Sequence, residues 1–457
     1  MPGDSLLTSS IQYGIVSRSL PLSGKILPGY IDASGAHLGL GVGNPNAEFT
    51  PNVSACALTS DGGTAKVLWG FRHGEVAITT VPRAMDSHRR PMAELLRCDP
   101  REQHEGAVLD VGWDDAANTL LASAGADGRV KVWDAKAVRC LWTSERNVKA
   151  LVPQAYVKVK LSPSQSFVVA VTRSGEIVLW PGFDMQTMGS FNANAVHEVR
   201  VACPVVPRES QAPEDTDTRE ILACYVDPHA SIPTVLVAYR ANTVFNRIRI
   251  EETGNIDIGT FGDASFGAIS AVAPCFDSES SFILAGDHLG CVSVYNWRSE
   301  QHPAPPIRKF EAHDMASVSA IAWNGVTLIT GSANGTTHAW DALTFEHLKS
   351  FASPVPRMHR GRGGAPGNGA VGDRAREAVR QILVGQEKGV MVVSVGDRVL
   401  AWKAGPAPNH HRGGVRGRHS SGPIPKKKDS HGGAKYHGGC SLVPLLYTIT
   451  NAFLSGH

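Results

Sequence analysis

The sequence predicts an all-β protein built from repeated four-stranded antiparallel units. The clearest unit covers residues 104–143, with strand-like stretches at residues 108–113 and 120–122 and strict alternation of side chains at residues 130–133. Ala126, Asp127 and Gly128 separate two of these strands, and Asp and Gly suit the backbone angles of a tight turn. Residues 313–351 repeat the pattern in register, so the unit recurs along the chain.

Seven units of this kind can be placed between residues 50 and 405, and one unit alone cannot bury both of its faces. In chain order they span residues 53–81, 104–143, 157–183, 199–252, 268–298, 313–351 and 378–403. The fourth is the most divergent, so six or eight units remain alternatives. Residues 1–49 form a separate N-terminal segment, and we expect residues 11–16, or the stretch after them, to supply an outer strand that closes an open sheet edge.

Both clear units place a histidine, a hydroxyl residue, a turn residue and a tryptophan at matching positions. These are His104, Ser123, Asp127 and Trp133 in the first copy, and His313, Thr330, Asn334 and Trp340 in the second. Such a unit resembles a WD40 repeat, one blade of a β-propeller. The resemblance implies a buried hydrogen-bonded relay from His to Ser or Thr to Asp, backed by Trp, which serves the fold and not catalysis. The predicted fold is therefore a seven-bladed WD40 β-propeller, with Asn334 in the place of the Asp in one relay.

Charge and cysteine content restrict the function only loosely. Lys and Arg number 44 against 42 Asp and Glu, so local charged patches, not net charge, can guide partners. The eight cysteines form no C-x-x-C pair or Cys/His cluster, which favours reduced thiols in the cytoplasm, the nucleus or both. We find no signal peptide, and the apolar run at residues 442–454 is too short and too interrupted to span a membrane, so no membrane partner is expected.

No motif in the sequence predicts catalysis. A P-loop, an H-E-x-x-H metal motif, a G-x-S-x-G nucleophile elbow and a dinucleotide fingerprint followed by a helix are all missing. We therefore predict that the protein is not an enzyme and has neither a cofactor nor a metal site. Residues 406–457 are basic and of low complexity, and we interpret their His410, His411, His419 and His431 as solvated residues of a disordered tail.

Three arginines occupy one place, the first position of the turn between the second and third strands of a unit. They are Arg72, Arg173 and Arg240, in the first, third and fourth units. Equivalent turns of a propeller lie on one face, so these guanidinium groups should share it. In substrate-receptor propellers of the F-box/WD class, arginines at this place bind phosphorylated peptides, because a guanidinium matches phosphate oxygens with two parallel hydrogen bonds. The alternative is three separate, solvated arginines.

A further resemblance concerns the end of the propeller. Residues 402–405 (WKAG) and 432–436 (GGAKY) are similar to segments of fungal F-box/WD-repeat proteins, although no F-box is visible before Ser54. The resemblance implies a protein-interaction platform that serves as the substrate-recognition part of an SCF-type ubiquitin ligase. Its expected partners are ligase subunits and the acidic or phosphorylated segments of other proteins.

A nuclear scaffold protein in chromatin or RNA processing is the alternative function. Lys426, Lys427 and Lys428 resemble a nuclear localisation signal, and the basic loop at residues 354–374 could contact nucleic-acid phosphates together with the tail. Tyr436 is the one aromatic residue within that basic run, which argues against a dedicated RNA-binding segment. The first function predicts that charge reversal at the three arginines abolishes partner capture and that deletion of the tail is tolerated. The second function predicts the opposite.

Overall fold

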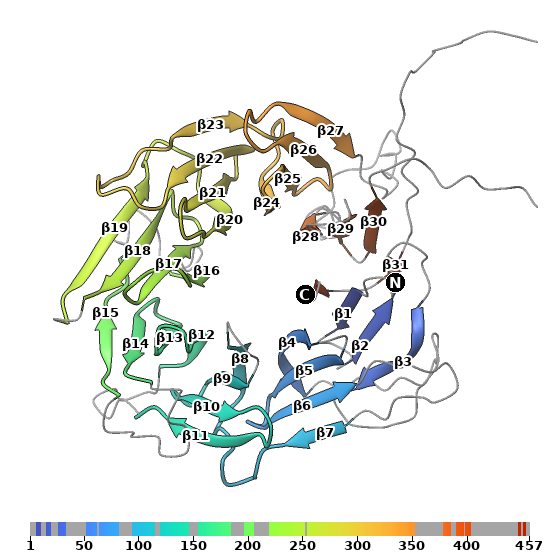
Figure 1. Ribbon diagram of the computed structural model, residues 1–457, viewed down its shortest axis with the longest axis vertical. Coiled ribbons are helices and arrows are strands. Elements are labelled where there is room, and N and C mark those ends of the chain that lie inside the picture. Colours follow the sequence, from blue (N-terminus) through green and yellow to red (C-terminus); the bar gives the residue numbers. More distant parts are fainter. Residues whose placement is uncertain are drawn as a thin grey trace, which may run out of the picture.

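The computed structural model of the protein is a ring of antiparallel β-sheets around a central axis (Figure 1). Its described residues form eight four-stranded sheets and no helix. The all-β propeller predicted from the sequence is therefore confirmed. The described residues are 6–10, 15–19, 26–32, 52–61, 64–81, 94–114, 119–145, 154–183, 196–204, 219–251, 254–351, 378–384, 390–396, 398–403, 447–448 and 451–453.

Seven sheets, here called blades one to seven, each use four successive strands from the centre of the ring outward (Figure 1). Blades one to four consist of β4 (Val53–Asp61), β5 (Thr64–Phe71), β6 (Val76–Val81) and β7 (Glu94–Arg97); β8 (Val108–Trp113), β9 (Leu120–Gly125), β10 (Val130–Asp134) and β11 (Arg139–Thr143); β12 (Tyr156–Ser162), β13 (Phe167–Thr172), β14 (Ile177–Pro181) and β15 (Val199–Val201); and β16 (Ile221–Val226), β17 (Thr234–Tyr239), β18 (Val244–Ile250) and β19 (Ile256–Gly262). Blades five to seven consist of β20 (Ile269–Cys275), β21 (Phe282–Asp287), β22 (Cys291–Asn296) and β23 (Arg308–Glu311); β24 (Val318–Trp323), β25 (Thr327–Ser332), β26 (Thr337–Asp341) and β27 (His347–Phe351); and β28 (Val379–Val384), β29 (Val390–Val395), β30 (Arg398–Lys403) and β31 (Tyr447–Thr448).

These seven blades correspond to the seven units predicted between residues 50 and 405, but five outer strands lie beyond the predicted bounds of their units: β7, β15, β19, β23 and β31. The sequence pattern assigns Val199 to the fourth unit, but β15 pairs with β14 and is the outer strand of blade three. The polar insertion at residues 208–220, expected within the fourth unit, therefore lies between β15 of blade three and β16 of blade four in the sequence.

The blades share one backbone irregularity, which links each to the next. In all seven, the pairing of the first two strands shifts by one residue near the start of the first strand, as a β-bulge does. Where the bulged residue is a serine, its hydroxyl group donates a hydrogen bond to the first strand of the following blade. The three bonds are Ser54 Oγ to Val108 O (2.7 Å), Ser270 Oγ to Val318 O (2.6 Å) and Ser319 Oγ to Val379 O (2.6 Å).

Beside this bulge, a glycine in the second strand lets the next blade approach closely. A methyl group added to Gly70 would lie 2.6 Å from Cγ1 of Val108, and Gly286 faces Val318 in the same way. A larger residue at either glycine would push the neighbouring blades apart, so the glycine and the valine of the next blade form one packing unit.

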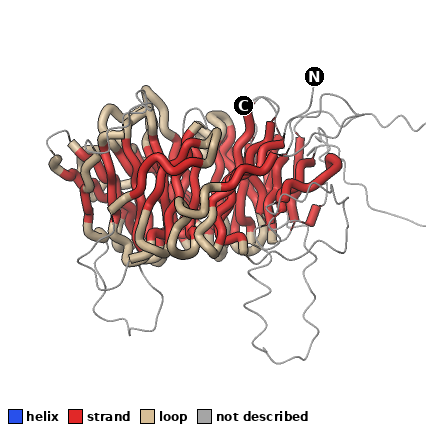
Figure 2. The backbone as a smooth tube through the Cα atoms, turned by 90° about the horizontal axis from the view of Figure 1, so that it is seen from below, coloured by secondary structure: helices blue, strands red, loops and turns tan. Residues whose placement is uncertain are grey.

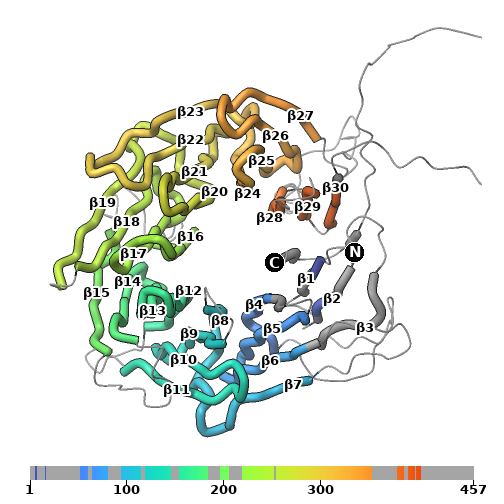
Figure 3. The backbone as a smooth tube through the Cα atoms, viewed as in Figure 1, coloured from blue at the N-terminus to red at the C-terminus, as the bar shows by residue number. Residues whose placement is uncertain are grey.

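The eighth sheet joins the two ends of the described chain. Its order is β3 (Ile26–Asp32), β2 (Ile15–Ser19), β1 (Leu6–Ser10) and β32 (Asn451–Phe453), with Leu7 opposite Phe453. Figure 3 shows β1 beside the C-terminal end of the chain. The N-terminal segment therefore contributes three strands of a further sheet, where the sequence suggested one outer strand. No relay or tight-turn motif marks these strands, and their fourth partner lies more than four hundred residues away.

Of the tail predicted at residues 406–457, the structure describes only β31 and β32, and both are strands. The histidines and lysines singled out in the tail, the basic loop at residues 354–374 and the GGAKY segment lie outside the described residues.

The core consists of eight apolar clusters, one between each pair of adjacent sheets. The two clusters that close the ring meet at β1, where consecutive side chains of a strand point to opposite faces. Leu6 packs on blade seven beside Val392, and Leu7 packs on blade one beside Trp69. Both leucines are fully buried, so the closing sheet completes the ring of apolar clusters.

The connections between strands gather on the two faces of the ring (Figure 2). In each of the seven blades, the residue that opens the turn between the second and third strands donates its amide hydrogen to the carbonyl just before the first strand. These bonds run from Arg72 to Asn52, Ala126 to Ala107, Arg173 to Ala155, Arg240 to Glu220, His288 to Ala268, Ala333 to Ser317 and Gly396 to Ala378, at 2.7–3.0 Å. The turns and the connections between blades therefore share one face, here called the turn face.

Candidate protein-interaction face

The relay of blade two is a continuous chain of hydrogen bonds beneath the turn face. The indole N–H of Trp133 donates to Ser123 Oγ at 2.9 Å, and the Ser123 hydroxyl group lies 2.7 Å from His104 Nε2. His104 Nδ1 lies 3.1 Å from each carboxylate oxygen of Asp127. All four side chains are buried, so the chain ties the third strand, the second strand, the turn and the preceding connection into one geometry.

The electrostatics of Asp127 support the charged form of this relay. Burial would raise its pKa, but the hydrogen bond and the charge of His104, with the amides of Glu105 and Arg129, outweigh burial and lower the pKa below its ordinary value. Asp127 therefore stays ionised while it orients His104. Every polar group of the relay has a partner, so it has no free group for substrate chemistry.

The relay of blade six has the same start and a different end. Trp340 Nε1 donates to Thr330 Oγ1 at 2.9 Å, and Thr330 Oγ1 lies 3.0 Å from His313 Nε2. The second ring nitrogen of His313 contacts Thr336 Oγ1 at 3.2 Å and does not contact Asn334. Asn334 is one step further along, where its Oδ1 accepts from Thr336 Oγ1 at 2.7 Å. The predicted contact between His313 and Asn334 is therefore corrected, because the shorter path to the histidine is taken by a hydroxyl group two residues later.

Two more histidines extend the blade-six relay toward solvent. His338 stacks on His313 with ring centroids 4.4 Å apart and contacts Ala312 O through Nδ1 at 2.8 Å, and His347 lies edge-on to His338. Burial, and then the neighbouring His338, lower the pKa of His313 to about 4. Burial also lowers the pKa of His338. This relay is therefore neutral at pH 7, in contrast to that of blade two.

Blade one holds a reversed version of the tryptophan contact. Trp69 lies on the second strand and donates to Thr79 Oγ1 on the third strand at 2.9 Å, which exchanges the two positions seen in blades two and six. The sequence shows this exchange, because Trp69 and Thr79 occupy each other's expected places.

The structure places Arg72, Arg173 and Arg240 at equivalent, exposed positions on the turn face. Blades three and four are neighbours, so Arg173 and Arg240 open adjacent turns. Arg72 is one blade further, because blade two carries Ala126 at this position. Arg173 and Arg240 therefore lie on neighbouring sectors of the turn face, and blade two separates Arg72 from them.

The three guanidinium groups differ in their contacts. Arg240 Nε lies 2.8 Å from Glu220 Oε1, with both side chains more than half exposed, so water screens this ion pair. The guanidinium groups of Arg72 and Arg173 have no hydrogen bond or ion pair with another described residue. The Glu220 contact was not predictable, because Glu220 belongs to the polar insertion before blade four and reaches Arg240 only through the blade geometry.

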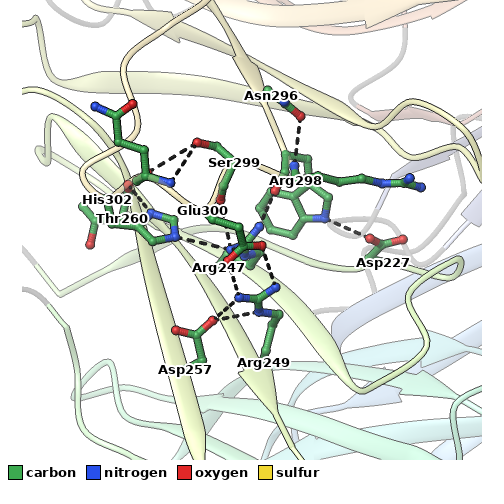
Figure 4. A network of polar contacts seen from close by, with 12 residues as sticks. Asp227, Arg247, Arg249, Asp257, Thr260, Asn296, Arg298, Ser299, Glu300 and His302 are labelled. Carbon is green, nitrogen blue, oxygen red and sulfur yellow. Dashed lines mark hydrogen bonds and ion pairs between the residues drawn. The ribbon is translucent and has the colours of Figure 1, made fainter.

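A separate polar cluster lies between blades four and five, toward the opposite face (Figure 4). Arg247 on β18 is 3 % exposed and donates to the carbonyls of Trp297 and Ser299 at 2.5 and 3.1 Å. Its guanidinium group also lies over the rings of Phe261 and Trp297. Trp297 in turn donates to Asp227 at 2.8 Å. Sequence reasoning missed this cluster, because a buried arginine within the apolar strand β18 has no motif of its own.

The outer part of the same cluster is an ion-pair network (Figure 4). Arg249 binds both carboxylate oxygens of Glu300 at 3.1 and 3.0 Å and also contacts Asp257 at 2.6 Å. His302 lies between Arg247 Nη2 and the carbonyl of Thr260. These contacts fix the connection between β22 and β23 against blade four. We interpret the cluster as a structural clamp, since its charged groups are already paired.

No set of three or more His, Cys, Asp or Glu side chains in the described part of the chain is arranged to hold a metal ion. Within the same residues, no helix has the length and hydrophobicity needed to cross a membrane.

Comparison with known proteins agrees with the two relays. Residues 98–134 and 304–341 match the family model WD40, described as "WD domain, G-beta repeat". Each match contains one complete relay and ends at the Trp-Asp pair of the third strand, Asp134 in blade two and Asp341 in blade six. The fold and these sites define a β-propeller of WD repeats.

Two known proteins are similar to the chain. WD repeat-containing protein AAC3 of Dictyostelium discoideum is 32% identical over 98 residues, which are 21% of this chain and 19% of that protein. The chain therefore matches about a fifth of the length of this relative. The crystal structure of the computationally designed Ika8 protein has a TM-score of 0.53 and 15% sequence identity, and the match covers 88% of this chain and 94% of that one, so the likeness concerns the fold alone. The chain therefore contains two WD40 repeats, in blades two and six.

Proposed function

We propose that this WD40-repeat protein recognises an acidic or phosphorylated segment of a partner protein on its turn face, through Arg72, Arg173 and Arg240. WD40 repeats indicate a protein-interaction scaffold, and propellers of this family are generally non-catalytic. The observation that carries the proposal is the placement of three exposed arginines at one position of the turn, two of them without a partner among the described residues.

The chemistry of the arginines fits a phosphate or a carboxylate. A guanidinium group keeps its charge at physiological pH and offers parallel N–H donors that match two oxygen atoms. Glu220 does not block Arg240, because an exposed ion pair of this kind is worth only about 0.2–1 kcal/mol and a doubly charged phosphate competes well with it. We further propose that the segment belongs to a protein selected for ubiquitination, with this chain as the substrate-recognition part of an SCF-type ligase.

The test is affinity purification from cells that express the tagged chain, with and without phosphatase treatment of the lysate. We expect the wild type to capture phosphoproteins and ligase subunits, and the Arg72→Glu/Arg173→Glu/Arg240→Glu variant to lose the phosphoproteins. The matched control reverses three exposed cations away from the turn face, Lys136, Arg139 and Lys349, and changes the net charge by the same amount. Equal loss in the control, or capture that phosphatase leaves intact and the variant retains, would contradict the proposal.

A nuclear scaffold protein is the second candidate, supported by the basic sequence around Lys426, Lys427 and Lys428. The same purification separates the two functions. If ribonucleoprotein or chromatin components come down equally with the wild type and the arginine variant, and deletion of residues 406–446 removes them, the scaffold function replaces the first proposal.

A further inference from the structure

Two exposed apolar side chains lie on the turn face in segments that follow the arginine turns of blades three and four along the chain. Leu289 opens onto solvent in the turn of blade five with 55% of its surface exposed, and Met315 lies in the connection from blade five to blade six with 93% exposed. Met315 also has a positive φ of 50°, an uncommon backbone state for a residue other than glycine. Met315 therefore presents a flexible apolar side chain to solvent at a backbone position that costs conformational energy.

The backbone shows that these residues are contiguous with the arginine turns. Tyr239 Oη donates to Gly175 O at 2.6 Å, which joins the turn that Arg173 opens to the strand before Arg240. The turn of Arg240 continues to Asn242, whose carbonyl accepts from Ile269 N at 2.7 Å. Ala268, the residue before Ile269, accepts from His288 N at 2.9 Å.

The same continuity holds from blade five to blade six. Leu289 lies against Gly267, since a methyl group added there would be 2.9 Å from Leu289 Cγ. Gly290 O accepts from Ala312 N and His313 N at 2.8 and 3.0 Å, which brings the Leu289 turn against the connection that carries Met315. Arg173, Arg240, Leu289 and Met315 thus follow one another along the rim of the turn face.

The charges along this rim change sign. Arg173 and Arg240 lie at one end, and the exposed Asp314 precedes Met315 at the other; between them, Asp263 in the connection from blade four to blade five has the cation of Lys309 nearby. An acidic block would be attracted to the arginine end and repelled from the Asp314 end. A bound segment therefore has one favourable direction.

We propose that the partner segment is bipartite, with an acidic or phosphorylated block over Arg173 and Arg240 and an apolar residue over Leu289 and Met315. This inference rests on the proposed function and adds the apolar contact and the direction of the segment. The acidic block increases the rate of association by electrostatic attraction, and the apolar residue makes binding selective among acidic segments. A segment of about eight to twelve extended residues reaches roughly 26–40 Å at about 3.3 Å per residue, which sets the peptide length for the test.

The probe is a synthetic peptide library in which a block of glutamate and phosphoserine is fixed and each following position is randomised. We expect the purified wild-type chain to enrich Leu, Ile, Met or Phe at a single spacing after the block. A labelled peptide with Leu at that spacing should bind about tenfold more tightly than its Ser counterpart, as partial burial of one leucine allows. The Leu289→Ser/Met315→Ser variant should lose this tenfold preference and bind the Ser peptide as the wild type does.

The matched control is Val326→Ser/Leu343→Ser, which removes two exposed apolar side chains, 74% and 83% exposed, from the opposite face of blade six. This variant should keep the preference for Leu. Acidic peptides that bind without a preference for Leu, or a preference lost only in the control variant, would overturn the bipartite segment and leave the proposed function standing. Acidic peptides that bind no better than neutral ones would overturn both.

Discussion

The two complete WD repeats perform one structural task with different electrostatics. In blade two, the histidine is oriented by the ionised Asp127, and in blade six by the hydroxyl group of Thr336, with Asn334 behind it. Each relay still ends on a tryptophan N–H bonded to a strand hydroxyl group at 2.9 Å. The comparison shows that the relay depends on the geometry of its donors and acceptors, and that its charge can be exchanged for a neutral, hydroxyl-rich network.

The largest expected effect is shared by both repeats and comes from their tryptophans. Replacement of Trp133 or Trp340 by Ala opens a cavity between two blades, and we expect each to lower the free energy of unfolding by about 3–5 kcal/mol, with Trp133 at the upper end. Trp133 is fully buried, whereas Trp340 is 7% exposed. Urea unfolding followed by tryptophan fluorescence and circular dichroism measures the difference. A larger loss at Trp340 would contradict the packing described for the two repeats.

The pH dependence distinguishes the two repeats most sharply. The pKa of His313 in the folded protein, about 4, lies below the ordinary value of 6.5, so protonation favours the unfolded chain and stability falls as the pH drops from about 6.5 to about 4. Between pH 7 and pH 5 we expect a loss of about 2 kcal/mol from this group. The pKa of Asp127 is lowered instead, so its contribution is lost only at pH values below its ordinary 3.8.

The measurement is urea unfolding at pH 7 and pH 5 for the wild type and for His313→Gln, which cannot titrate. The variant should lose less stability than the wild type between the two pH values, and Asp127→Asn should lose as much as the wild type. Parallel pH profiles for wild type and His313→Gln would show that the blade-six histidine is not held neutral by burial.

Asp127 in blade two should contribute more to stability than Asn334, its counterpart in blade six. Asp127→Ala leaves His104 Nδ1 and the amides of Glu105 and Arg129 without their acceptor in a buried site, and we expect a loss of about 1–3 kcal/mol. Asp127→Asn keeps the shape and should lose less. Thermal unfolding of the three proteins at pH 7 gives the order, and equal stability of all three would contradict an orienting role for the carboxylate.

The smallest effect is expected for the reverse exchange in blade six. Asn334 is exposed and reaches His313 only through Thr336, so Asn334→Asp should change the stability by no more than about 0.5 kcal/mol at pH 7. Differential scanning calorimetry of this variant beside Asp127→Asn makes the comparison direct. A gain of more than about 1 kcal/mol would mean that the neutral relay is an incomplete version of the charged one.

The sequence predicts those parts of the molecule that have a local signature. His104, Ser123, Asp127 and Trp133 are found because they match the relay positions of the WD40 repeat that the unit resembles, and the arginine turns are found by aligning the turns of the units. Thr336 was missed because Asn334 occupies the sequence position of the Asp in the other relay. The hydrogen bond of His313 goes instead to Thr336, the side chain that lies closer to it.

The parts that escaped prediction depend on contacts between distant segments. The closing sheet pairs β1 with β32 from opposite ends of the chain, and the Arg247 clamp joins β18 to the connection before β23. Neither feature produces a periodic pattern in the sequence, because each is formed by contacts between segments that are distant along the chain. The pairing of Arg240 with Glu220 escaped for the same reason.

The central claim is that the turn face, with its arginines, is the face that receives a partner. Site-specific photo-crosslinking tests it directly, with a photoreactive residue at Ala126, between the arginine turns of blades one and three, or at Lys136 on the turn between β10 and β11. We expect phosphatase-sensitive crosslinks to a partner from Ala126 and none from Lys136, and loss of the Ala126 crosslinks when Arg72 and Arg173 are changed to Glu. Crosslinks from Lys136 instead, or Ala126 crosslinks that persist without the arginines, would contradict the claim.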